Sequence, residues 1–209
     1  MTSQSELTTR LLLVRHGQTE QSREDAFCGV TEVPLTAEGR IQAQKLATRL
    51  HSQTVDALYC STQGRARETA APIAQALELK AQECTSLREM SFGLWETRSR
   101  QDLAEHCPKE LALWERGSWM VQMPDGESQQ AVIARVMPCM VDLLHQYAGK
   151  TLVVVSHKST LRLFLGQVLN MSLTASRSLR LDPASLTELH LTLDVAQLIY
   201  CNDTSHLSS

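Results

Sequence analysis

The chain has 209 residues, of which 43% are hydrophobic and 21% are charged, and its formal net charge at pH 7 is −3. This is the composition of an ordinary globular protein, and the mildly acidic balance gives no basic footprint for nucleic acid or for an anionic membrane. The longest apolar runs are about six residues, against the ~20 that a membrane-spanning helix needs, so we expect no membrane partner. The N-terminus has no basic start followed by an apolar block, so no secretory signal is expected.

The cysteine pattern indicates a reducing, cytoplasmic environment. The cysteines are far apart and contain no C-x-x-C pair, which argues against a zinc site or a redox motif. They are Cys28, Cys60, Cys84, Cys107, Cys139 and Cys201. The length favours one domain over residues 1–209, with flexible ends at about 1–9 and 203–209.

Apolar runs and helical periods alternate along the chain. Strands are predicted, in chain order, at Leu11–Val14, Val55–Tyr59, Thr151–Val155, Leu186–Leu193 and Val195–Tyr200. Helices are predicted after the N-cap Thr36, across Ala66–Leu77, after the N-cap Ser128 and across Leu161–Val168. Pro138 predicts a kink or a break in the third helix. The alternation favours an α/β layered fold whose last two strands form a hairpin, with residues 99–118 as an insertion near the strand ends.

Polar side chains follow three of these strands at the point where each strand ends. The sets are Arg15-His16-Gly17, Ser61 with Arg65, and Ser156-His157-Lys158. If the strands are parallel neighbours, these residues share one edge of the sheet, where ligands of α/β folds bind. Arginine guanidinium groups and helix N-termini bind anions such as phosphate. A neutral imidazole beside them is a competent phosphoryl acceptor.

Five motifs occur in an order that resembles a known family. They are "LLLVRHGQTE", "STQGRARET", "LREMSFGLWE", "DGES" and "VVVSHKS". Together they resemble the histidine phosphatase superfamily, the phosphoglycerate mutase-like proteins, from about Leu11 to about Leu169. The resemblance implies a three-layer α/β/α sandwich around a mostly parallel central sheet.

The resemblance also implies a role for each matching residue, and it implies no metal and no cofactor. His16 matches the histidine that is transiently phosphorylated, and Arg15 and Arg65 match phosphate-binding arginines. Glu89 matches the proton donor to the leaving oxygen, and His157 matches a second histidine that helps to hold the transferred group. These roles agree with the positive charge and in-line positioning that phosphoryl transfer needs.

The chain departs from the family pattern at two positions near this site. Ser22 stands where the family often has an asparagine, and we expect its hydroxyl to donate to phosphate. Lys158 stands where a glycine is usual, and we hypothesise that it adds charge for an acidic substrate. The candidate substrate-binding residues are Gln18, Thr19, Cys28, Gly29 and Lys158.

The sequence favours a metal-independent phosphomonoesterase that acts on a small phosphate ester. The "SFGLWE" that follows Glu89 resembles the phosphatase branch, and "FCGVTEVPLT" resembles its α-ribazole phosphatase-like members. Residues 90–127 are expected to line the pocket, and the family analogy suggests a homodimer. A phosphoglycerate mutase-type phosphoryl transfer is one alternative. Another, of a different class, is a catalytically silent module that binds a phospho-ligand.

Overall fold

The computed structural model describes residues 7–118, 121–192 and 194–208. Its described strands form one six-stranded sheet in the order β3-β2-β4-β1-β5-β6. The strands are β1 (Thr9–Arg15), β2 (Ala57–Ser61), β3 (Ala81–Cys84), β4 (Thr151–Ser156), β5 (Leu186–Leu191) and β6 (Ala196–Asp203). The first four strands run parallel, and β5 and β6 form the predicted antiparallel hairpin. The predicted mostly parallel α/β fold is therefore confirmed.

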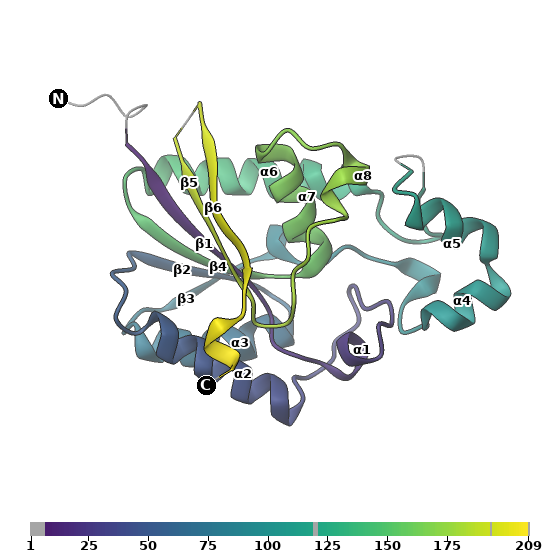
Figure 1. Ribbon diagram of the computed structural model, residues 1–209, viewed down its shortest axis with the longest axis horizontal. Helices are drawn as coiled ribbons and strands as arrows, with labels where there is room; N and C mark the ends of the chain where they lie inside the picture. Colours follow the sequence, from purple (N-terminus) through teal and green to yellow (C-terminus); the bar gives the residue numbers. More distant parts are fainter. Residues whose placement is uncertain (1–6, 119–120, 193, 209) are drawn as a thin grey trace.

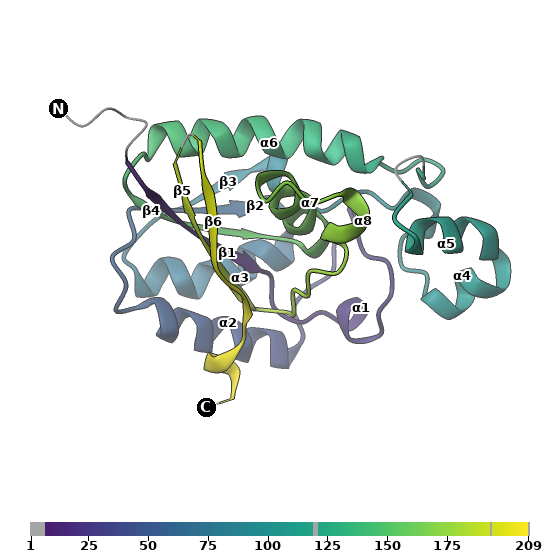
Figure 2. The same ribbon diagram turned by 45° about the horizontal axis from the view of Figure 1, so that its top comes forward.

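Helices cover both faces of this sheet, which explains the unbroken apolar runs of the strands. The helices α2 (Ala37–Leu50) and α3 (Gly64–Ala76) lie on one face, and α6 (Gln129–Gln146) and α7 (Lys158–Val168) lie on the other (Figure 1, Figure 2). In β1, Leu11 and Leu13 belong to the core under α6 and α7, whereas Leu12 and Val14 belong to the core under α2 and α3. Alternate residues of one strand thus fill two cores.

The helix starts follow the predicted caps, but the predicted effect of Pro138 needs a correction. The hydroxyls of Thr36 and Ser128 accept hydrogen bonds from backbone N–H groups at the starts of α2 and α6. The α6 helix then runs unbroken through Pro138. Pro138 lies on the exposed side of the helix, where water can hydrate the carbonyl of the exposed Ala134 that loses its partner.

Several short elements had no clear sequence signal. They are α1 (Glu20–Arg23), α4 (Arg100–His106), α5 (Pro108–Glu115), α8 (Leu173–Ser176) and the 3₁₀-helices η2 (Thr85–Leu87), η3 (Gly93–Trp95) and η4 (Ser205–Leu207). The edge strand β3 was not predicted either, because its four residues are half-buried or exposed and lack an apolar run. The pair α4 and α5 lies beyond the end of the sheet (Figure 1).

A third apolar cluster attaches this region to the body of the protein. It includes Phe27, Phe92, Trp95 and Trp114, whose rings meet edge to face. Trp95 and Trp114 are buried in this cluster, while Trp119 lies outside the described residues.

The described part of the C-terminal end, residues 203–208, contacts α2 and the segment before β5. Lys45 Nζ on α2 donates to the carbonyl of Leu207 at 3.0 Å. The ring of His206 is buried and contacts the carbonyl of Ala184 through Nε2 at 3.1 Å. Residues 1–6 and 209 lie outside the described part, and Thr9 already belongs to β1. No described helix has the length and hydropathy that crossing a membrane requires.

Candidate active site

The three polar strand ends meet at one edge of the sheet. The strands β2, β4 and β1 are parallel neighbours, and Arg15 pairs in register with Ser156. Beyond their carboxyl ends lies a cavity of about 270 Å³. The predicted residues that line it are Arg15, His16, Thr19, Ser22, Cys28, Arg65, Glu89 and Lys158. The segment 90–127 contributes Met90, Phe92, Arg100 and Trp114 to its walls.

His16 is held in the tautomer that a nucleophile needs. Its ring is 5% exposed, and its Nδ1 lies 2.7 Å from the carbonyl oxygen of Gly17. Because a carbonyl only accepts hydrogen bonds, Nδ1 carries the proton and Nε2 keeps its lone pair. Burial, with Arg65 and Arg15 nearby, lowers the pKa of His16 well below 6.5. The neutral ring therefore presents an unprotonated nitrogen.

The turn after β1 depends on Gly17 and on a threonine that the sequence reading did not single out. A Cβ on Gly17 would lie 2.6 Å from the carbonyl oxygen of Gly39, so α2 can approach only a glycine here. The backbone N–H of Gly17 donates to Thr69 Oγ1 at 3.0 Å. Thr69 belongs to the same "RARET" stretch as Arg65, whose carbonyl accepts from the Thr69 hydroxyl at 2.7 Å. A residue of the "STQGRARET" motif thus helps to hold the turn that follows His16 in the "LLLVRHGQTE" motif.

Arg15 is a buried cation with an unused donor. One of its terminal nitrogens donates to the carbonyl of Leu181 at 2.6 Å, while its buried Nε has no partner within the described part of the chain. Burial lowers the pKa of Arg15 to about 10, so the side chain remains charged at neutral pH. A buried N–H without a partner is expensive, and an anion in the cavity would satisfy it.

Arg65 is fixed by hydrogen bonds in three directions. Its terminal nitrogens donate to the carbonyls of Thr31 at 3.0 Å and Gly29 at 2.6 Å. Its Nε donates to Nδ1 of His157 at 3.2 Å. The side chain is 1% exposed, and its remaining N–H groups belong to the wall of the cavity.

His157 is not among the residues that line the cavity, and its predicted contact with the transferred group stays a prediction. The ring is fully buried and lies 5.1 Å from that of His16, measured between centroids. Its Nδ1 accepts from Arg65, so Nε2 carries the proton and donates to Ser61 Oγ at 2.8 Å. Burial and the nearby Arg65 lower the pKa of His157 well below 6.5. In this geometry His157 orients Arg65.

Glu89 sits at the N-terminus of α7. Its carboxylate accepts hydrogen bonds from the backbone N–H of Ser159 at 3.0 Å and of Thr160 at 3.1 Å. It also accepts from Met90 N at 2.8 Å. A helix N-terminus suits a carboxylate, and these bonds fix the side chain in the cavity wall.

Two of the candidate substrate-binding residues contact other parts of the scaffold. Gln18 and Gly29 do not line the cavity. Gln18 Oε1 accepts from the hydroxyl of Thr36 at 2.9 Å, and the Gly29 carbonyl accepts from Arg65. A Cβ on Gly29 would lie 2.1 Å from the carbonyl oxygen of Met90, so this position also needs a glycine.

Ser22 and Thr19 line the cavity but are already engaged with each other. Thr19 caps α1 by accepting from the Ser22 backbone N–H, and the Ser22 hydroxyl donates to the Thr19 carbonyl at 2.9 Å. In this geometry the Ser22 hydroxyl proton is used within the capping box, and the expected donation from Ser22 to phosphate stays a prediction.

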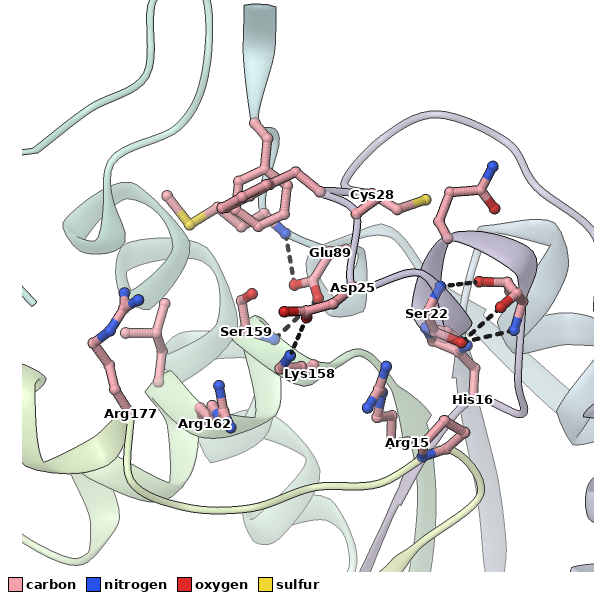
Figure 3. Close-up of a pocket in the computed structure, with 18 of the residues that line it drawn as sticks. Arg15, His16, Ser22, Asp25, Cys28, Glu89, Lys158, Ser159, Arg162 and Arg177 are labelled. Atoms are coloured by element: carbon pink, nitrogen blue, oxygen red, sulfur yellow. Dashed lines mark hydrogen bonds and ion pairs between the residues drawn. The ribbon is translucent and has the colours of Figure 1, made fainter. Parts of the chain in front are cut away.

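Sequence reasoning missed several residues that line the cavity. Arg162 and Arg177 lie beyond Lys158 in the cavity wall, and Asp25 pairs with Lys158 (Figure 3). Asp25 also pairs with Arg100. Only Arg162 had a usable signal, because it lies four residues after Lys158 and so shares a helix face with it.

Comparison with known proteins agrees with this site. The family model for the histidine phosphatase superfamily (branch 1) matches residues 11–204. The chain is 32% identical to the adenosylcobalamin/alpha-ribazole phosphatase of Escherichia coli, over 92% of this chain and 95% of that protein. It is 28% identical to phosphoserine phosphatase 1 of Hydrogenobacter thermophilus, over 95% and 94% of the two chains. The chain belongs to the histidine phosphatase superfamily, branch 1.

Solved structures show the same architecture. Bacillus stearothermophilus YhfR superposes with a TM-score of 0.89 at 26% identity, covering 95% of this chain and 99% of that one. Family membership confirms the expected enzyme class, a phosphomonoesterase of the histidine phosphatase type that acts on small phosphorylated metabolites.

Proposed function

We propose that this enzyme hydrolyses its substrate through a phosphohistidine on His16. The observation that carries the proposal is the tautomer of His16, whose Nδ1–H is bound by the Gly17 carbonyl so that Nε2 is a nucleophile. The buried guanidinium groups of Arg15 and Arg65 supply the charge that the phosphoryl oxygens need. A cavity of about 270 Å³ favours a small metabolite over a peptide.

In the first step His16 Nε2 attacks phosphorus in line with the leaving oxygen. A P–N bond forms and the P–O bond to the leaving group breaks, while protonated Glu89 gives its proton to the departing oxygen. Arg15 and Arg65 neutralise the charge on the equatorial oxygens throughout.

In the second step water attacks the phosphorus of phosphohistidine. Glu89, now ionised, takes a proton from the water as the P–O bond forms and the P–N bond breaks. Inorganic phosphate leaves and His16 is again neutral. His157 acts through Arg65, whose Nε it binds, and so serves as a positioning residue.

The relatives leave the natural substrate open among small phosphate esters. Their names refer to adenosylcobalamin, alpha-ribazole and phosphoserine. We therefore place the substrate of this chain in the general class of phosphorylated small metabolites. Transfer of the phosphoryl group to an acceptor other than water is the alternative, as in a phosphoglycerate mutase.

The test is hydrolysis of p-nitrophenyl phosphate in the presence of a metal chelator, together with trapping of the phosphoenzyme by an alkaline quench. The wild type should turn over and show a phosphate that is labile in acid and stable in base, as expected of a P–N bond. His16→Ala should lose both signals. His145→Ala, which removes an exposed histidine on α6, is the matched control and should retain both.

Two results would contradict the proposal. One is a His16→Ala enzyme that still turns over, which would place the nucleophile elsewhere. The other is a phosphoenzyme that forms but passes its group only to a second phosphoglycerate molecule, which would indicate a mutase.

A further inference from the structure

The cavity contains more positive charge than one phosphate requires. Among the described residues, six basic side chains and three carboxylates line it. The basic ones are Arg15, Arg65, Arg100, Lys158, Arg162 and Arg177, and the acidic ones are Asp25, Glu89 and Asp182. A phosphate monoester carries a charge of roughly −1.5 to −2 at pH 7. It would leave at least one positive charge in the cavity uncompensated.

The surplus of positive charge lies on one side of the cavity, away from His16. Figure 3 shows Arg177, Arg162 and Lys158 following one another along the wall, with Arg15 and His16 beyond them. Lys158 and Arg162 occupy neighbouring turns of α7, and Arg177 comes directly after α8. These three side chains are here called the basic wall.

The carboxylates of the cavity are mostly engaged with other groups. Asp25 lies 2.6 Å from Arg100 but 3.8 Å from Lys158. Asp182 pairs with Arg180 at 2.8 Å, and Glu89 accepts from the start of α7. Within the part of the chain that the structure describes, neither Arg162 nor Arg177 has a carboxylate partner. The basic wall thus lacks a strong counter-charge.

The two arginines of the basic wall are held in place by neutral groups. Arg162 Nε donates to the carbonyl of Leu179 at 2.6 Å, which leaves its terminal N–H groups for a ligand. The Arg177 guanidinium lies 4.3 Å from the centre of the Trp114 ring, which orients its plane. Burial and the proximity of Arg162 and Arg100 lower the pKa of Arg177 to about 10, although Glu115 opposes this shift.

From this arrangement we infer that the basic wall is a second anion subsite, and that the substrate is a phosphate ester bearing a further anionic group. That group is a carboxylate or a second phosphate, since a guanidinium fork suits both. The reacting phosphoryl group lies at His16, and the other anion lies between Arg162 and Arg177. This inference rests on the proposed function, because it assigns the two ends of one substrate.

The test uses pairs of esters that differ in one anionic group. O-Phosphoserine and O-phosphoethanolamine differ only in a carboxylate. Propane-1,3-diol bisphosphate and 3-hydroxypropyl phosphate differ only in a phosphate. The wild type should prefer the more anionic member of at least one pair by about tenfold or more in kcat/KM, as one charge-assisted hydrogen bond would give. The pair with the larger preference identifies the second anion.

Variants of the basic wall should reduce this preference selectively. Arg162→Gln and Arg177→Gln should each lower kcat/KM for the more anionic ester about tenfold more than for its partner. Arg162→Lys and Arg177→Lys should restore part of the preference, because they keep the charge. Arg116→Gln removes an exposed arginine outside the cavity lining and should leave kcat/KM for every ester at the wild-type value.

Equal kcat/KM values within both pairs for the wild type would overturn the inference, as would equal losses for both members in the glutamine variants. In either case turnover of the esters would leave the phosphohistidine mechanism intact. By contrast, a wild type that hydrolyses no ester and leaves His16 unlabelled would overturn the proposed function itself, and this inference with it.

Discussion

Two neighbouring histidines in this protein carry their protons on opposite nitrogens. His16 is protonated on Nδ1 by its contact with the Gly17 carbonyl, and His157 is protonated on Nε2 because Arg65 donates to its Nδ1. Guanidinium groups near both rings disfavour a further positive charge, and burial does so more strongly. One imidazole thereby presents an unprotonated Nε2, as the proposed nucleophile requires, and the other accepts a hydrogen bond from an arginine.

The lowered pKa of His16 predicts that phosphorylation of the enzyme continues in mild acid. A histidine with an ordinary pKa of about 6.5 would be roughly tenfold less available at pH 5.5. Since the His16 pKa lies well below that value, its neutral form persists there. Single-turnover phosphorylation between about pH 7 and pH 5, at saturating substrate, should lose less than half of its rate. A tenfold loss centred on pH 6.5 would contradict the lowered pKa.

Arg65 should not tolerate replacement by lysine, although the charge is kept. An ammonium cannot donate at once to His157, Thr31 and Gly29, as the guanidinium does. We expect Arg65→Lys to reduce the rate of phosphorylation about 100-fold, as loss of two charge-assisted hydrogen bonds would. Arg67→Lys on the same helix is the control, because Arg67 is exposed and makes only a 3.8 Å ion pair with Glu83. Similar rates for both variants would refute the special role of Arg65.

At the scale of elements, the site depends on side-chain contacts between segments that are not paired with each other in the sheet. The Glu96 carboxylate accepts from the backbone N–H groups of Gly29, Thr31 and Phe92, and so joins the loop before α2 to the segment after Glu89. Burial opposes its charge, but these hydrogen bonds prevail and the pKa of Glu96 lies below 4.5. The same loop presents the carbonyls that hold Arg65.

A second such contact joins β3 to α6 through two thiols. Cys84 Sγ lies 3.1 Å from Cys139 Sγ, and this hydrogen bond lowers the pKa of Cys84 to about 6. Hydrogen peroxide should oxidise the Cys84 thiolate to a sulfenic acid, and the second peroxide oxygen should leave as hydroxide. The Cys139 sulfur should then attack the sulfenic sulfur, so that an S–S bond forms, the S–O bond breaks and water is released. Peptide mapping should find this pair joined while Cys60, whose pKa burial raises to about 11, stays reduced. Oxidation of Cys60 before the pair would contradict this prediction.

At the scale of the whole molecule, an ion pair across the sheet contributes to stability. Arg10 on β1 donates to both carboxylate oxygens of Glu188 on β5, at 2.8 and 2.9 Å, and a further nitrogen donates to Gln53. The hydrogen bond from Arg10 is the main cause that lowers the pKa of Glu188 to about 2. A lowered carboxyl pKa stabilises the fold above the unfolded value of about 4.3, and this contribution is lost as the pH falls toward 2.

Urea unfolding should therefore separate Glu188→Gln from the wild type in a pH-dependent way. Near pH 7 we expect the variant to be less stable by on the order of 2 kcal/mol, after allowance for the partial exposure of Arg10. The difference should shrink below about pH 4 as the wild-type carboxylate takes up its proton. The control Glu83→Gln alters an exposed, weakly paired side chain and should match the wild type throughout. A difference that does not change with pH would contradict the assignment.

The sequence by itself determined the family, the fold class and the centre of the site. These features are local, because an apolar run buried on both faces predicts a strand and His16 and Arg15 follow such a strand directly. Arg65 and Glu89 also lie in short contiguous motifs. Only the tertiary structure decided that His157 lies behind Arg65 and that Gln18 and Gly29 hold the scaffold. It alone assembled Lys158, Arg162 and Arg177 into one wall, because the direction of a side chain and its partners depend on packing between segments far apart in the chain.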